Sequence, residues 1–129
     1  MTVAVTTLRA TLAAALSNPM VWSVFGYPPA SPLANSVVVE PDDPYIVPSN
    51  NQHITIAPLA NFRIKLYLPL LDNQGSLESM EEFIVDVFTK LAASSLSYNI
   101  GSVSGVSVDT TAGDLLSTEI RLSILTSWA

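Results

Sequence analysis

The segment that most constrains the fold is Asn61–Leu68, where apolar and polar side chains alternate strictly. The apolar set comprises Phe62, Ile64, Leu66 and Leu68. The intervening positions are Arg63, Lys65 and Tyr67. Alternation with a period of two is typical of a strand that turns one face to a core and the other to solvent or a neighbouring molecule. The chain is therefore expected to build a sheet around this strand.

Two helices are predicted. Val5–Ser17 carries leucines at positions 8, 12 and 16, which form one apolar stripe, and Asn18-Pro19 ends the pattern. Thr6 or Thr7 is the expected cap. A longer helix begins near Ser76 and fades through residues 92–96. Its apolar residues recur at three- and four-residue steps: Leu77, Met80, Ile84, Val87, Phe88 and Leu91.

Further strands are predicted at Val21–Phe25, Ser36–Glu40, Val103–Asp109 and Leu115–Thr126. The β-branched run at residues 37–39 favours a strand buried on both faces. Residues 110–114 join the last two strands, which predicts a hairpin. The predicted fold class is α/β, of the α+β kind. A mixed, mainly antiparallel sheet is packed by two helices in the order α-β-β-loop-β-α-β-β, within a single domain spanning residues 1–129.

The segment Pro41–Pro58 interrupts this order. Prolines and the run Ser49-Asn50-Asn51-Gln52 resist regular structure, yet several side chains are too apolar for a free linker. We expect a projecting loop or arm that packs against a neighbouring subunit. With the terminal aromatic residue, it supplies the candidate interface: Asp42, Asp43, Tyr45, Ile46, Val47, Ile54, Ile56 and Trp128.

The chain offers little chemistry for catalysis. It has no cysteine, one histidine, five Lys and Arg, eleven Asp and Glu, and a net charge of −6. His53 is the candidate general base, but no partnered nucleophile motif surrounds it, so a surface histidine is favoured. Asp42 and Asp43 lack the calcium-loop spacing. These features predict a protein that is not an enzyme, with no cofactor and no metal.

The charge balance argues against nucleic-acid binding, which requires clustered Lys and Arg. The apolar stretch Leu59–Leu71 contains Arg63, Lys65 and Pro69 and is too short to span a bilayer. High apolarity with a charged fraction of 12% instead predicts a protein that covers part of its surface with partners.

Three segments carry a resemblance to a known family. They are the run from Trp22 through Tyr27-Pro28-Pro29, the run Val37-Val38-Val39-Glu40-Pro41-Asp42-Asp43-Pro44-Tyr45-Ile46, and the amphipathic helix after Asp72-Asn73. In order and spacing they resemble the tail terminator proteins of long-tailed, siphovirus-type bacteriophages, especially those of actinobacterial hosts.

The resemblance implies a structural virion protein that forms a ring, typically a hexamer. Its partners would be further copies of itself, the tail tube protein and the head–tail connector protein, and the candidate interface residues would contact either a neighbouring subunit or the tube. It would be made in the host cytoplasm and end in the tail or neck. Three alternatives stay open: another neck protein, such as a connector or completion protein; a small-ligand-binding α/β module; and an enzyme using His53.

Overall fold

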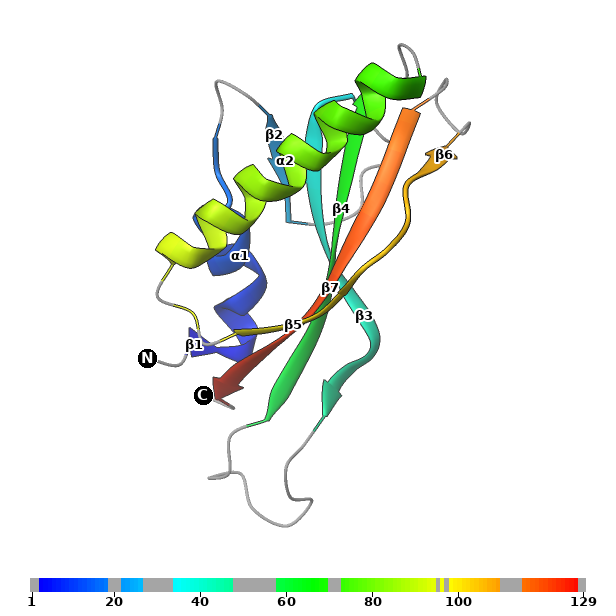
Figure 1. Ribbon diagram of the computed structural model, residues 1–129. Helices are drawn as coiled ribbons and strands as arrows, with labels where there is room; N and C mark the ends of the chain where they lie inside the picture. Colours follow the sequence, from blue (N-terminus) through cyan, green and yellow to red (C-terminus); the bar gives the residue numbers. More distant parts are fainter. Residues whose placement is uncertain are drawn as a thin grey trace.

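The computed structural model describes residues 3–18, 22–26, 34–47, 58–69, 73–94, 96, 98–109 and 115–127. These residues form an α+β fold, as predicted from the sequence (Figure 1). In chain order the elements are β1 (Val3–Ala4), α1 (Val5–Ala15), β2 (Ser23–Phe25), β3 (Ser36–Val47), β4 (Leu59–Pro69), α2 (Asn73–Ala93), β5 (Tyr98–Val103), β6 (Ser107–Asp109) and β7 (Leu115–Ser127).

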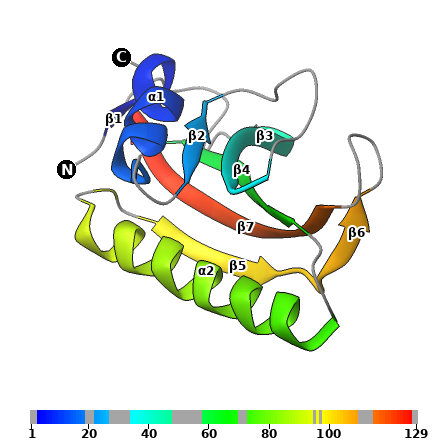
Figure 2. The ribbon, with the colours of Figure 1, turned by 90° about the horizontal axis from the view of Figure 1, so that it is seen from above.

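The strands form one seven-stranded sheet in which β7 holds a central place. β4 pairs with one edge of β7 along its whole length. The other edge of β7 is shared by β6, β5 and β1, which pair with its start, middle and end in turn. Figure 2 shows β7 between β4 and the β5–β6 stretch. The sheet is mixed and mainly antiparallel, because only the β1–β7 and β2–β3 pairs among the described strands are parallel.

β3 is longer than the predicted strand Ser36–Glu40. After a register shift between Pro41 and Ile46, the ladder with β4 resumes through the pairs Ile46–Ala60 and Val47–Leu59. Within the irregular stretch, the side-chain amide of Asn61 donates a 3.0 Å hydrogen bond to the carbonyl of Pro44. β3 therefore continues to Val47 through the first part of the segment predicted as a loop or arm, and residues 48–57 of that segment lie outside the described residues.

The predicted strand Val103–Asp109 is two strands, and the first begins earlier than expected. β5 starts at Tyr98, the break covers residues 104–106, and β6 follows. A register shift between Ile100 and Ser102 adds one residue to β5, the mark of a β-bulge. The predicted hairpin between the last two strands is present as an antiparallel β6–β7 pair.

The helix ends also differ slightly from prediction. α1 ends at Ala15, and its cap residue is Ala4, which makes no side-chain cap hydrogen bond. The hydroxyl of Thr7 instead donates to the carbonyl of Ala4 at 3.2 Å. α2 begins at Asn73, ahead of the predicted start near Ser76. The two-residue strand β1 carries no periodic signal and was not predicted.

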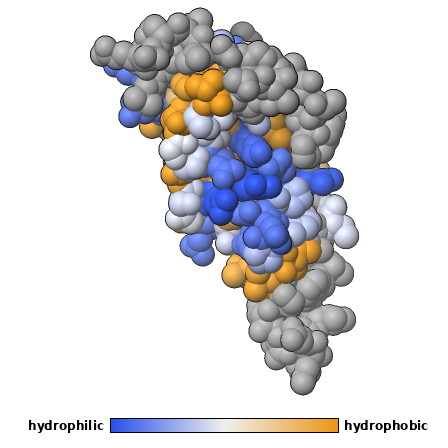
Figure 3. All heavy atoms as spheres, turned by 90° about the vertical axis from the view of Figure 1, so that its right-hand side faces the viewer, coloured by the Kyte–Doolittle hydropathy of each residue, from blue (hydrophilic) through white to orange (hydrophobic). Residues whose placement is uncertain are grey.

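The two described helices pack on the same face of the sheet, and no helix among the described residues covers the opposite face. The buried side chains of α1 and α2 share one cluster with inward-facing residues of β3, β4 and β7. We call the opposite surface the open face. Figure 3 shows it with hydrophilic residues across the middle and hydrophobic residues toward both ends. The molecule is thus a two-layer structure of helices on a sheet.

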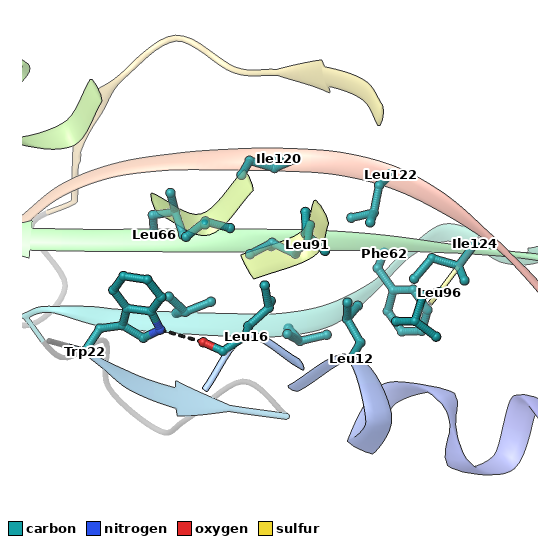
Figure 4. Packing of buried hydrophobic residues seen from close by; sticks show 14 of the residues in the cluster. Leu12, Leu16, Trp22, Phe62, Leu66, Leu91, Leu96, Ile120, Leu122 and Ile124 are labelled. Carbon is teal, nitrogen blue, oxygen red and sulfur yellow. Dashed lines mark hydrogen bonds between the residues drawn. The ribbon is translucent and has the colours of Figure 1, made fainter. Parts of the chain in front are cut away.

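The core lies between the helices and the sheet (Figure 4). The fully buried leucines at positions 8, 12 and 16 of the first helix confirm the predicted stripe. From the sheet, Phe62, Ile120 and Ile124 are also fully buried. Trp22 closes one end of this cluster, and its indole Nε1 donates a 2.8 Å hydrogen bond to the carbonyl of Leu16. Burial of these side chains fixes which face of each strand points outward.

Candidate functional site

The open face is formed by the outward-pointing side chains of three adjacent long strands, β3, β4 and β7. The strand registers place alternate side chains of these strands on this surface. They include Val38, Glu40, Val47, Leu59, Asn61, Arg63, Lys65, Tyr67, Leu115, Ser117, Glu119, Arg121, Ser123 and Leu125. Paired residues on adjacent strands lie directly opposite each other, so their side chains interact across the ladder.

An ion cluster occupies the middle of the open face. Oε1 of Glu40 lies 3.1 Å from Nη2 of Arg63 and 3.2 Å from Nζ of Lys65. Asp42 joins the cluster through Oδ1, which is 3.6 Å from Nε of Arg63. The Glu40 side chain is only 9% exposed, whereas the two cations are each 32% exposed. The acid thus lies beneath the bases, which cover it from solvent.

Two buried atoms of this cluster make no hydrogen bond despite the short ion-pair distances. They are Oε1 of Glu40 and Nε of Arg63. The charged atoms lie close enough to attract one another, but their geometry is not that of hydrogen bonds. We take the cluster to be held by charge attraction, with hydrogen-bonding capacity left over.

Charge on the open face is balanced. A second ion pair, between Nη2 of Arg121 and Oε1 of Glu119 at 3.3 Å, lies beside the cluster. Among the ion-paired side chains described on this face, the acids Glu40, Asp42 and Glu119 equal in number the bases Arg63, Lys65 and Arg121. The whole chain has a net charge of −6. This surface therefore repels a negatively charged partner less than the rest of the molecule does.

An apolar patch lies at the end of the open face nearest the 48–57 segment. It consists of Val47, Leu59 and Leu125, which are 39%, 36% and 38% exposed. Strand register places Val47 beside Leu59 and Leu59 beside Leu125, so the three side chains form one row across β3, β4 and β7. At the other end Val38, Tyr67 and Leu115 are buried in a small cluster of their own.

The structure places the predicted interface residues of β3 in different environments. Asp42 belongs to the ion cluster, and its carboxylate also accepts a 2.8 Å hydrogen bond from the backbone N–H of exposed Asp43. The ring of Tyr45 packs edge-on against Phe62 with ring centroids 5.5 Å apart. Ile46 is half-buried and Val47 is exposed. Ile54, Ile56, Trp128 and the candidate base His53 lie outside the described residues.

Sequence reasoning missed most of this surface. Leu59, Leu125 and the Glu40 ion cluster were not proposed as interface residues, although one signal was available. In the last strand, the outward positions 117–123 are polar, and Leu125 breaks that pattern. An apolar residue at an outward position marks either a second core or an interface.

The described residues contain no group of three or more His, Cys, Asp or Glu placed to hold a metal ion. Within the described part of the chain, no helix combines the length and hydropathy needed to cross a bilayer. No family profile matches the chain, and a search of curated proteins found no relative.

Proposed function

We propose that the protein is a structural virion protein: the tail terminator of a long-tailed phage. Copies associate into a ring that caps the tail tube, ends its polymerisation and presents the head-joining surface. The observation that carries the proposal is the open face, a large sheet surface without a helix layer that combines a row of exposed apolar residues with balanced charge. It adds to the resemblance seen in the sequence.

The apolar patch is the part of the open face suited to supply binding energy. Val47, Leu59 and Leu125 are each more than one-third exposed and lie in register on three strands. Burying apolar surface contributes about 25 cal/mol per Å². Beyond the intervening row of Asn61 and Ser123, the ion cluster supplies charges of both signs, which favour one orientation of a partner over others. A ring contact needs both properties, because each subunit must bind the next at a fixed angle.

The patch can be tested by making it polar. We expect the double variant Leu59→Ser/Leu125→Ser to reduce self-association at least about tenfold, since several kcal/mol of apolar burial would be lost from each contact. Sedimentation velocity and negative-stain electron microscopy of the purified protein report the ring and its loss. Ile100→Ser is the matched control, because Ile100 is 37% exposed but lies on β5, away from the patch.

The cap function needs a second assay. Wild-type protein added to polymerising tube protein of the same virus should stop elongation and shorten the tubes, and the double variant should not. Tubes that grow to the same length with and without wild-type protein would contradict the terminator proposal. Rings that form but leave tube length unchanged would point instead to another neck protein.

A further inference from the structure

A polar cavity of about 190 Å³ lies on the open face, beside the break between β5 and β6. Lys65 of β4 and Glu119 of β7 line it, together with the hydroxyl-bearing side chains of Ser104, Ser107 and Ser117. A single water needs about 10–15 Å³ on this measure, so the cavity has room for a group of several heavy atoms.

The two charged residues of the cavity face each other but pair with other partners. Lys65 and Glu119 are directly opposite in the β4–β7 ladder, a position at which opposite charges attract each other. Among the described residues, however, the ammonium of Lys65 pairs with Glu40 at 3.2 Å. The carboxylate of Glu119 pairs with Arg121 at 3.3 Å. The cavity is therefore lined by an N–H donor from one strand and a carboxylate acceptor from the next, which form no ion pair with each other.

Backbone hydrogen bonds hold the Glu119 side of the cavity in place. The N–H of Ser104 donates to the carbonyl of Glu119 at 2.8 Å, and the N–H of Glu119 donates to Oγ of Ser104 at 3.0 Å. The hydroxyl oxygens of Ser107 and Ser117 lie 3.4 Å apart across the β6–β7 pair. Serine at these three positions leaves space that a longer side chain would fill, so the pairing of β7 with β6 and the break before it builds the cavity.

We propose that the cavity binds a primary carboxamide group. Such a group offers one carbonyl acceptor and two N–H donors. The acceptor fits the ammonium of Lys65 and the donors fit the carboxylate of Glu119, and hydrogen bonds to charged groups are stronger than those between neutral groups. An ion fits less well, because Lys65 and Glu119 are already paired and an ion of either sign is repelled by one of them.

The test titrates propionamide into isotope-labelled protein carrying Leu59→Ser/Leu125→Ser, which keeps the open face uncovered and leaves the cavity residues unchanged. We expect saturable NMR shifts of the Ser104 and Glu119 backbone N–H resonances, with a dissociation constant on the order of 10 mM. N,N-dimethylpropionamide lacks N–H donors and propionate is an anion, so both should bind at least about fivefold more weakly. Equal binding of the dimethyl amide would overturn the assignment to a primary carboxamide.

Two matched pairs of variants test the cavity itself. Glu119→Gln removes the carboxylate and should weaken binding about fivefold, whereas Glu78→Gln removes the same charge from α2 and should change it less than about twofold. Ser107→Leu fills the cavity and should abolish the saturable shifts. Ser102→Leu adds the same side chain at an exposed position of β5 outside the cavity and should preserve them. Equal effects within either pair would overturn the site, and thermal melts separate lost binding from lost folding.

The wild-type protein identifies the source of the amide. If a neighbouring copy presents it on an Asn or Gln side chain, excess propionamide should lower self-association in sedimentation velocity. If a separate molecule presents it, self-association should not change. The proposal does not rest on the ring, because the titration uses unassociated subunits. A cavity that binds no amide would leave the ring proposal standing, and a protein that forms no ring would leave the titration valid.

Discussion

Glu40 is the one buried charged residue among those described. A buried carboxylate is tolerated only where opposite charges compensate for the water it has lost, and here Arg63 and Lys65 both do so. The two bases remain one-third exposed, so water compensates them in turn. Glu40 is therefore the residue of the cluster whose replacement should lower stability most, because it pairs with both cations.

Replacing Glu40 should therefore lower stability more than replacing Glu119, another ion-paired acid of the open face. We expect Glu40→Gln to lower the free energy of unfolding by about 1–3 kcal/mol, since two cations lose their shared carboxylate. Glu119→Gln removes a single ion pair whose base, Arg121, is 53% exposed, and should change stability by less than about 1 kcal/mol. Urea denaturation followed by circular dichroism measures both. Equal losses would show that burial of Glu40 does not matter to the fold.

Two glycines, Gly101 in the bulge of β5 and Gly105 in the break before β6, differ in the space around them. A Cβ placed on Gly101, within the bulge, would lie 3.3 Å from the backbone carbonyl oxygen of Arg121. At Gly105, in the break before β6, a Cβ would meet nothing within 4 Å. The bulge also limits the pairing surface of β5, because a bulged edge strand is a poor template for another chain.

These two glycines form a matched pair for mutation. Gly101→Ala should destabilise the protein by about 1–3 kcal/mol, because the new methyl group presses on backbone that cannot move away cheaply. Gly105→Ala should be neutral to slightly stabilising, within about 0.5 kcal/mol, since it restricts the unfolded chain without a clash. Thermal unfolding of the two variants decides the point. A harmless Gly101→Ala would mean that the β5–β7 ladder shifts freely.

Elements with a strong periodic signal were predictable, and those formed by long-range pairing were not. The run Val37–Val39 predicted burial on both faces, and all three side chains are buried. By contrast, Pro41 and Pro44 carry loop signals, yet β3 continues through them because Ile46 and Val47 pair with β4. The apolar patch could not be predicted from the sequence for the same reason. Leu59 and Leu125 become neighbours only through the β4–β7 register, which local sequence does not encode.

At the scale of the whole molecule, charge is distributed unevenly between the two sides. The open face carries balanced charges, whereas the exposed side of α2 carries Glu78, Glu81, Glu82 and Asp86. A copy that binds the open face of the next through a surface other than its acidic helix avoids the repulsion that two acidic helices would impose. This asymmetry favours association on the sheet side.

If copies associate through the apolar patch, thermal stability should depend on concentration. Binding to the native state raises the melting temperature by mass action, so a ~100-fold rise in protein concentration should raise it by roughly 5 °C. Leu59→Ser/Leu125→Ser should melt at the same temperature at every concentration. Scanning calorimetry across a dilution series provides the measurement. A wild-type midpoint that does not move would argue against association in the folded state.

The central place of β7 has a consequence for synthesis. On a ribosome, β3, β4, β5 and β6 emerge before residues 115–127, yet β4, β5 and β6 all take β7 as a partner. Until β7 arrives, the nascent chain holds a long β4 strand with one edge unpaired and no strand between it and β5. Such an edge recruits other strands. The native sheet therefore closes only after β7 has emerged, and the interval between the synthesis of β4 and that of β7 is when the chain is most open to pairing with other strands.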